Sequence, residues 1–253
     1  MATILDVARL SQVSKTTVSR YINSNGPVKE DTRKKIVAAM EELNFSPNFF
    51  AQGMKTRRTK TIGILIADFS NPFYPELFKG IESVSRQHGY LNMICITGEN
   101  GEKELPTLEI LVNRKIDGII FNSYNRKEAT IHRLAEIART IPVVFMDPVL
   151  VDEPMSCVLS DGFTWSRKAA DYLIGRGKRR IAYIKGSSRH WETNERYRGY
   201  VEALKEAGLE AEEGLIYEGN FQMRSGFEGA EYFLQKEKSP DAIMAATDVM
   251  AIG

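Results

Sequence analysis

The amino-acid sequence predicts a small all-α headpiece followed by an α/β body made of two doubly wound parallel sheets. Three observations predict this fold class. Apolar residues recur at helical spacing through the first 45 residues, short apolar runs alternate with amphipathic stretches from Thr61 onward, and the net charge differs between the two parts. The chain of 253 residues, 43% of them hydrophobic, is long enough for more than one ordinary domain with a sizeable core.

The headpiece pattern predicts three short helices around one small core. The apolar residues at helical spacing are Ile4, Val7 and Ala8, then Val18 and Ile22, then Ile36, Val37, Met40 and Leu43. Thr3 with Asp6 predicts a capping box, Ser14 is a natural N-cap for the second helix, and Asn25-Gly26-Pro27 ends it. Because only residues 11–13 separate the first two helices, these must cross steeply. This is the helix-turn-helix arrangement, in which the second helix is presented to the major groove of DNA.

Charge also separates the headpiece from the body. Residues 1–60 contain 11 Lys and Arg against 5 Asp and Glu, a net charge of +6, and the remaining residues contain 23 against 28, a net charge of −5. A basic head favours a polyanionic partner, because each Lys or Arg placed on a phosphate releases a condensed counterion. A solvated charged face is the alternative explanation for the charge alone.

Residues 46–60 predict a short hinge helix next to a linker. Ser46-Pro47 combines an N-cap residue with a proline at the first helical position, and the basic run RRTK ends the segment. About nine residues are fewer than the ~12–15 at which helices become marginally stable in water, and Gly53 costs the helix about 1 kcal/mol more. We therefore expect this helix to be largely unfolded until something packs against it.

The sequence of the body predicts two lobes that join near Ser160. Its strand-like runs are TIGILIAD, LNMICITG, DGIIFNS, PVVFMD and MSCVLSD, then RIAYIKGS, GLIYEG and DAIMAATD. Strands this apolar, separated by helices, predict parallel sheets covered on both faces. The predicted regions are the headpiece 1–45, the hinge 46–60, a first lobe 61–160 and a second lobe 161–253. The sequence ends at VMAIG, near the start of a new helix, so we expect a fragment whose second lobe is incomplete.

Several classes of protein are disfavoured by the sequence. No secretory signal and no apolar run of ~18 residues is visible, which favours a cytoplasmic chain without a membrane segment. Cys95 and Cys157 stand far apart in apolar runs, as expected for reduced core thiols. Phosphate-binding and serine-hydrolase motifs are missing, and His88, His132 and His190 are scattered. We therefore expect no enzyme, no cofactor and no metal.

The motifs TILDVARLSQVSKTTVSRYIN, ELNFSPN, KTIGILIADFSNPFY, DGIIF, VVFMD, RYRGY and ATDVMAIG span essentially the whole sequence. Together they resemble the lactose/purine-repressor (LacI/GalR) family of bacterial transcription regulators. The resemblance implies a helix-turn-helix headpiece, a hinge helix and a two-lobed body like a periplasmic sugar-binding protein. It implies a repressor that binds operator DNA as a homodimer and responds to a sugar-like effector between the lobes. A solute-binding protein of the transport type is the alternative, but the basic head would then have no task.

The resemblance also assigns residues to DNA contacts. Lys15, Thr16 and Arg20 match the positions that face base edges, where Arg can donate two hydrogen bonds to guanine and Thr offers a methyl group to thymine. Positions nearer the DNA backbone are matched by Ser14, Thr17, Ser19 and Asn23. For the hydroxyl residues, helix capping is the structural alternative. Met54 matches the position where many family members have a leucine that wedges into the minor groove.

The effector-binding positions implied by the resemblance follow the strands of the body. They are Phe73, Asp147, Asp161, Trp191, Arg196, Phe221 and Asp248, with Asp68 as a further candidate. Aromatic faces, carboxylates and one Arg suit a cleft that stacks on a sugar or base ring and fixes its polar groups. The alternatives are core packing for the two Phe, a surface charge for Arg196 and a helix cap for Asp248. Because Ser160-Asp161 stands where Asp-Asn is common, the effector's identity does not transfer from the family.

Overall fold

A computed structural model describes residues 2–23, 26–46, 58–98, 100–122, 127–146, 155–188 and 190–253. The chain divides into two compact units, Met1–Thr59 and Lys60–Gly253. No helix in the described ranges is long and apolar enough to cross a membrane. The predicted hinge helix lies outside the described residues.

The first unit is a helical headpiece, as predicted. Its helices are α1 (Ile4–Leu10), α2 (Lys15–Ile22) and α3 (Glu30–Glu42). Val7, Val18 and Ile36, one from each helix, are fully buried in a shared core. The capping box is confirmed, because the Asp6 amide donates to the Thr3 hydroxyl and the Thr3 amide donates to the Asp6 carboxylate. These short-range contacts stabilise helices that are too short to persist alone.

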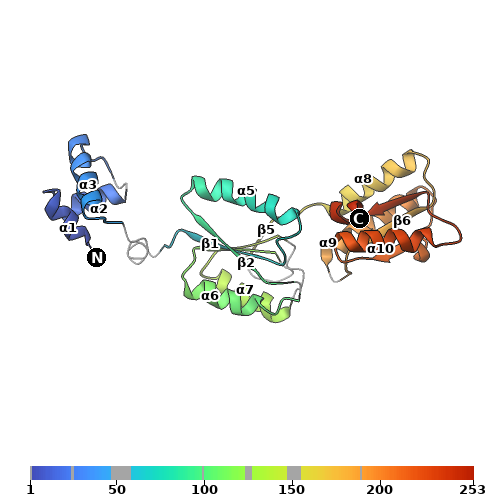
Figure 1. Ribbon diagram of the computed structural model, residues 1–253. Coiled ribbons are helices and arrows are strands. Elements are labelled where there is room, and N and C mark those ends of the chain that lie inside the picture. The colour runs from blue at the N-terminus through green and yellow to red at the C-terminus, as the bar shows by residue number, and fades with distance from the viewer. Residues whose placement is uncertain are drawn as a thin grey trace. The chain divides into compact units, whose positions relative to one another are not determined.

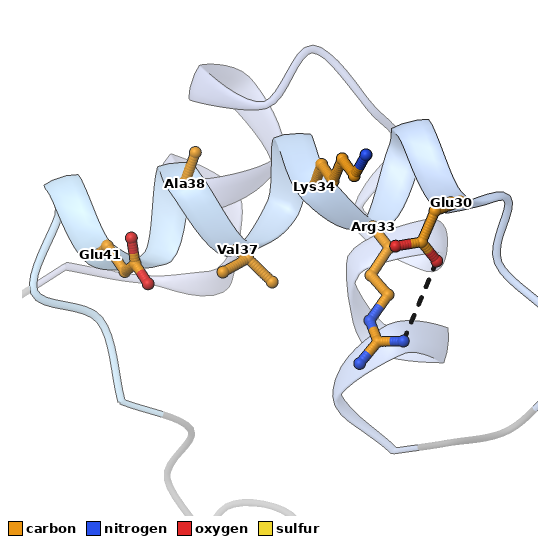
Figure 2. Close-up of a pocket in the computed structure, with 6 residues that line it drawn as sticks. All are labelled: Glu30, Arg33, Lys34, Val37, Ala38 and Glu41. Atoms are coloured by element: carbon orange, nitrogen blue, oxygen red, sulfur yellow. Dashed lines mark ion pairs between the residues drawn. The ribbon is translucent and has the colours of Figure 1, made fainter.

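The outer side of α3 carries a shallow hollow that faces solvent. Figure 2 shows its lining, which comes from this one helix: Glu30, Arg33, Lys34, Val37, Ala38 and Glu41. Arg33 and Glu30 form an exposed ion pair at 4.0 Å. Because a single helix cannot enclose a ligand, and ligand sites bury most of what they bind, we assign this hollow no binding role.

The first lobe of the body is a doubly wound α/β layer. Its elements are β1 (Thr61–Ile66), α5 (Phe73–Gln87), β2 (Leu91–Ile96), α6 (Glu104–Asn113), β3 (Gly118–Phe121), α7 (Glu128–Ala138), β4 (Val143–Phe145) and β5 (Ser156–Cys157). The described strands are parallel and lie in the order β2-β1-β3-β4-β5. Tyr74 of α5 packs with Ile64 and Ile66 on one face of the sheet, whereas Leu108 of α6 and Leu134 of α7 cover the other face. Figure 1 shows α5 on one side of the strands and α6 and α7 on the other.

The second lobe repeats this architecture around a shorter sheet. Its elements are α8 (Gly162–Gly175), β6 (Ile181–Lys185), α9 (Trp191–Glu206), a 3-10 turn (Glu213–Leu215), β7 (Ile216–Glu218), α10 (Met223–Leu234), β8 (Ala242–Ala245) and α11 (Asp248–Ile252). The described strands are parallel in the order β7-β6-β8. Helices α8 and α9 cover one face of this sheet, and α10 and α11 cover the other.

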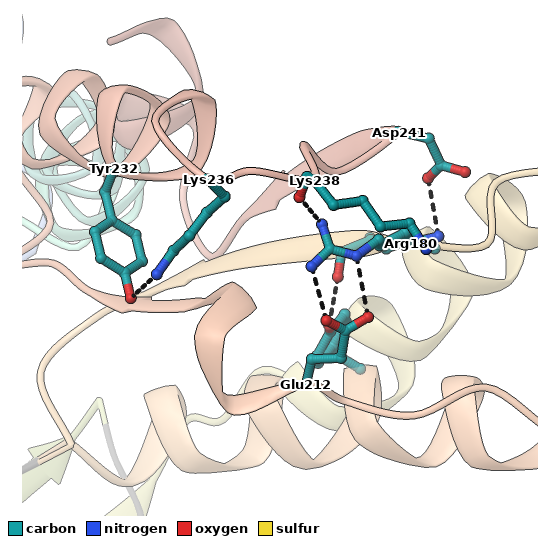
Figure 3. Close-up of polar contacts among 8 residues, drawn as sticks. Arg180, Glu212, Tyr232, Lys236, Lys238 and Asp241 are labelled. Carbon is teal, nitrogen blue, oxygen red and sulfur yellow. Dashed lines mark hydrogen bonds and ion pairs between the residues drawn. The ribbon is translucent and has the colours of Figure 1, made fainter.

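Polar contacts fix the ends at which the strands of the second lobe begin. The Asp241 carboxylate accepts hydrogen bonds from the backbone amides of Arg179 and Arg180, at 2.8 and 3.1 Å (Figure 3). The Arg180 guanidinium donates to Glu212 at 2.8 and 3.1 Å and to the carbonyl of Lys238. Since these groups precede β6, β7 and β8, the network ties together the amino ends of the strands and leaves the carboxyl ends for other chemistry.

One of the two cysteines departs from the expected pattern. Neither forms a disulfide, and Cys95 is partly buried in β2. Cys157 is exposed, so its predicted place in the core is wrong. The physical reason is position, because β5 holds only two residues at the end of the described sheet and both face solvent.

Candidate nucleic-acid interface and ligand site

Helix α2 has one side buried in the headpiece core and one side exposed to solvent. Val18 is fully buried, whereas Lys15, Thr16 and Arg20 are exposed. Thr16 and Arg20 are four residues apart and therefore share one face of the helix. The side chains predicted to contact base edges thus lie free of the headpiece core.

The residues predicted to lie nearer the DNA backbone form hydrogen bonds within α2 and at its ends. The Ser14 hydroxyl accepts a hydrogen bond from the Thr17 amide at 3.1 Å and contacts the Thr17 hydroxyl at 2.8 Å. The Asn23 amide group donates to the Ser19 carbonyl at 2.6 Å and to its hydroxyl at 3.1 Å. Helix capping therefore accounts for Ser14 structurally, and contacts with phosphate remain a prediction. Met54, the predicted minor-groove residue, lies outside the described residues.

In the second lobe, Arg196 lies between two helices and the end of a strand. It is on α9, and its guanidinium donates to the carbonyl of Ala246, just after β8, at 2.8 Å. A second guanidinium nitrogen lies 3.7 Å from the Glu192 carboxylate, one turn earlier on α9. The Ser160 hydroxyl donates to the other oxygen of Glu192 at 3.4 Å. Arg196 is therefore fixed at the carboxyl edge of the sheet and is not a free surface charge.

Phe221 and its neighbours form the aromatic part of the same edge. Phe221 follows β7 with a positive φ of 67°, and its ring centroid lies 5.2 Å from that of His190. A Cβ on Gly186 would come within 2.3 Å of two atoms of the Phe221 ring, so the ring occupies the space that the glycine leaves. Trp191 begins α9 beside His190 and is half-buried. Aromatic side chains that are partly exposed at this edge suit stacking on a flat or cyclic ligand.

The remaining predicted carboxylates have local partners. Asp161 caps α8 by accepting from the Thr164 amide at 2.9 Å, and its contacts with Thr164 lower its pKa. Asp248 is exposed at the start of α11, where the N-cap is Thr247, so capping by its side chain does not explain Asp248. Asp68 of the first lobe accepts hydrogen bonds from the amide and hydroxyl of Ser70, which lower its pKa.

Two other predicted ligand-site residues belong to the first lobe. Phe73 starts α5 and is 53% exposed, so it is not an ordinary core residue. Its ring meets the buried ring of Tyr74 edge to face at 5.2 Å. Asp147 lies outside the described residues. The structure therefore places Asp161, Trp191, Arg196, Phe221 and Asp248 in the second lobe, and Phe73 in the first lobe.

A polar cluster at the same edge was missed from the sequence. Lys185 and Glu218 end the neighbouring strands β6 and β7, and their charged groups lie 3.1 Å apart. The Ser188 amide donates to Glu218 at 3.1 Å, which with the Ser188 hydroxyl and Lys185 lowers the pKa of Glu218. The signal was available, because each residue is a charge that directly follows an apolar run. Glu192, which pairs with Arg196, was likewise not among the predicted site residues.

Known proteins and protein families match this chain along its length. Residues 3–48 match the family model described as bacterial regulatory proteins, lacI family. Residues 59–253 match the model for periplasmic binding proteins and the sugar binding domain of the LacI family.

Among curated proteins, the HTH-type transcriptional regulator RegA of Clostridium saccharobutylicum is 37% identical over 100% of this chain and 76% of its own length. Catabolite control protein A of Priestia megaterium is 36% identical over 99% of this chain and 75% of its own.

Solved structures give the same result. The lac repressor dimer bound to operator and an anti-inducer matches with a TM-score of 0.84 and 25% identity, over 99% of this chain and 75% of that one. A complex of the transcriptional regulator CelR with cellobiose matches with a TM-score of 0.68 and 30% identity, with the same coverage. The chain therefore spans about three quarters of the length of these proteins.

Proposed function

Because the chain belongs to the LacI family of bacterial regulatory proteins, we propose that it is a transcriptional repressor whose affinity for operator DNA is controlled by a sugar or sugar derivative. The observation that carries the proposal is the exposed polar face of α2, formed by Lys15, Thr16 and Arg20 on a basic headpiece. The same chain carries a cluster of polar and aromatic side chains at the carboxyl edge of an α/β sheet, where such folds bind ligands.

The partners follow from the proposed function. The matched lac repressor structure is a dimer on its operator, and we propose a homodimer on a palindromic site here, because a two-fold protein suits a two-fold DNA sequence. A DNA-binding regulator works beside the chromosome, so we place it in the bacterial cytoplasm. We assign no catalytic residue and no cofactor.

A DNA mobility shift tests this function. The full chain should retard the DNA upstream of its own gene in the presence of excess non-specific competitor, and adding one member of a set of sugars should change the retarded fraction. A chain that binds every duplex equally, or binds none, would contradict the proposal.

Base contacts by α2 give a sharper expectation. Arg20→Ala should cost about 1–3 kcal/mol at one operator position and relax the base preference there, because it removes a bidentate contact with guanine. Lys15→Ala should act at a different position. Titration of single-base operator variants measures both effects, with Arg33→Ala on the exposed side of α3 as the control arginine. If affinity falls equally for all operator variants, Lys15 and Arg20 contact only the phosphate backbone.

Met54 is proposed to enter the minor groove at the operator centre. Met54→Ala should weaken specific binding and reduce the DNA bend, because a methyl group cannot unstack a base step. The bend is measured from the mobility of DNA fragments in which the operator is moved from the end to the middle. If the variant bends DNA as much as the wild type does, Met54 does not unstack the central base step. The hinge is then a passive tether.

A further inference from the structure

The arginine at the proposed ligand site carries its own counter-charge. Arg196 and Glu192 are four residues apart on α9, a spacing that places both on one face of the helix. The side chains are 31% and 17% exposed, and the Glu192 oxygen that faces Arg196 is buried, so the pair is largely shielded from solvent. Partly buried ion pairs are screened less than surface pairs, so at 3.7 Å the carboxylate offsets part of the field of the guanidinium.

Neighbouring groups fix this pair in place. The Ser160 hydroxyl donates to Glu192, and Arg196 donates to the Ala246 carbonyl. At the start of α8, a Cβ on Gly162 would lie 2.8 Å from a Glu192 carboxylate oxygen and 3.1 Å from the Arg196 Cγ. The pair therefore fills the space beside Gly162 and is restrained from both ends.

The other described cation of the edge is compensated in the same way. Lys185 lies 3.1 Å from Glu218, which also accepts two hydrogen bonds from Ser188. Asp161 and Asp248 add two further carboxylates near the same strand ends. Within the described part of this edge, each cation is thus matched by a carboxylate, which is a poor environment for an anion.

On the basis of the proposed function, we infer that Glu192 makes the site selective for uncharged polyhydroxy ligands and excludes phosphorylated or carboxylated sugars. A hydroxyl group both donates and accepts, so adjacent hydroxyls can donate to the Glu192 oxygen that Ser160 contacts and accept from Arg196 at the same time. A phosphate or carboxylate group carries a negative charge that Glu192 repels, so it gains less from Arg196 than a pair of neutral hydroxyls does. Rejection by a like charge is an established route to specificity.

The test asks whether removing the carboxylate opens the site to an anion. Inorganic phosphate is the probe, and its dissociation constant is measured by calorimetry on the full chain at constant ionic strength. Glu192→Gln should bind phosphate about tenfold more tightly than the wild type, because the guanidinium then lacks a counter-charge. The double variant Glu192→Gln/Arg196→Gln should lose this gain.

Matched variants separate the site from general charge effects. Glu195→Gln is the control, since Glu195 is 16% exposed on the same helix and pairs with Arg198 at 2.8 Å. It should leave phosphate binding unchanged, and anions bound by the basic headpiece contribute equally to every variant. Glu192→Ser provides a second replacement if the glutamine variant folds poorly, as judged by its circular dichroism.

Two results would overturn the inference. One is wild-type phosphate binding as tight as that of Glu192→Gln, and the other is a gain for Glu195→Gln as large as that for Glu192→Gln. The measurement needs no DNA, so a failure here is distinct from a failure of operator binding in the mobility shift.

Discussion

Replacing Arg196 with alanine is expected to weaken effector binding by about 100-fold and to abolish the response of operator binding to the effector. The variant removes a guanidinium that donates to the Ala246 carbonyl and faces the ligand edge of the second lobe. Hydrogen bonds to charged groups contribute about 1.5–3 kcal/mol each, and two of them account for the expected loss. Because regulation is a coupling free energy between sites, a ligand that no longer binds cannot change DNA affinity.

The comparison that isolates Arg196 uses another arginine of the same helix. Arg198 is 64% exposed and pairs with Glu195, so Arg198→Ala should keep the effector response. Arg196→Lys should recover only part of it, since an ammonium group lacks the planar fork of the guanidinium. Calorimetry with the effector found in the sugar screen gives the dissociation constants. Equal affinities of wild type and Arg196→Ala would remove Arg196 from the site.

Local sequence signals were sufficient for the fold. The capping box at Thr3 and the N-cap at Ser14 depend on residues three positions apart, and both form as predicted. The parallel sheets were predictable because their strands are apolar on both faces and separated by amphipathic helices. Cys157 shows where this reasoning stops, because an apolar run does not reveal that its strand lies at the end of the described sheet.

The site was predictable only in part, because contacts between distant helices and strands cannot be derived from local sequence patterns. The resemblance pointed to Arg196, but the contact with Ala246 joins residues 50 positions apart. Lys185 and Glu218 come together through the register of β6 and β7, which neither strand encodes alone. The exposure of Phe73, which its sequence left open, depends on how α5 packs on its sheet.

Helices α8 and α9 support the ligand edge, and they pack closely. They share a core with β6 in which Ala170 and Tyr200 are fully buried. The Tyr200 hydroxyl donates to the Ile181 carbonyl at 2.7 Å, which holds α9 against the sheet. Gly199 lies where the two helices meet, and a Cβ there would be 2.2 Å from the Phe163 carbonyl oxygen and 3.0 Å from the Arg167 amide nitrogen.

Gly199→Ala is therefore expected to destabilise the second lobe by about 3 kcal/mol, at the upper end of overpacking effects, because the methyl group meets backbone atoms that cannot turn aside. The chain contains two tryptophans, Trp165 on α8 and Trp191 on α9, so their fluorescence during urea unfolding reports on this helix pair. Gly175→Ala is the matched control, since nothing lies within 4 Å of a Cβ at the end of α8, and this variant should be neutral or slightly more stable. If Gly199→Ala unfolds at the same urea concentration as Gly175→Ala, the helices have room for a side chain, and the close approach that positions Arg196 is not required.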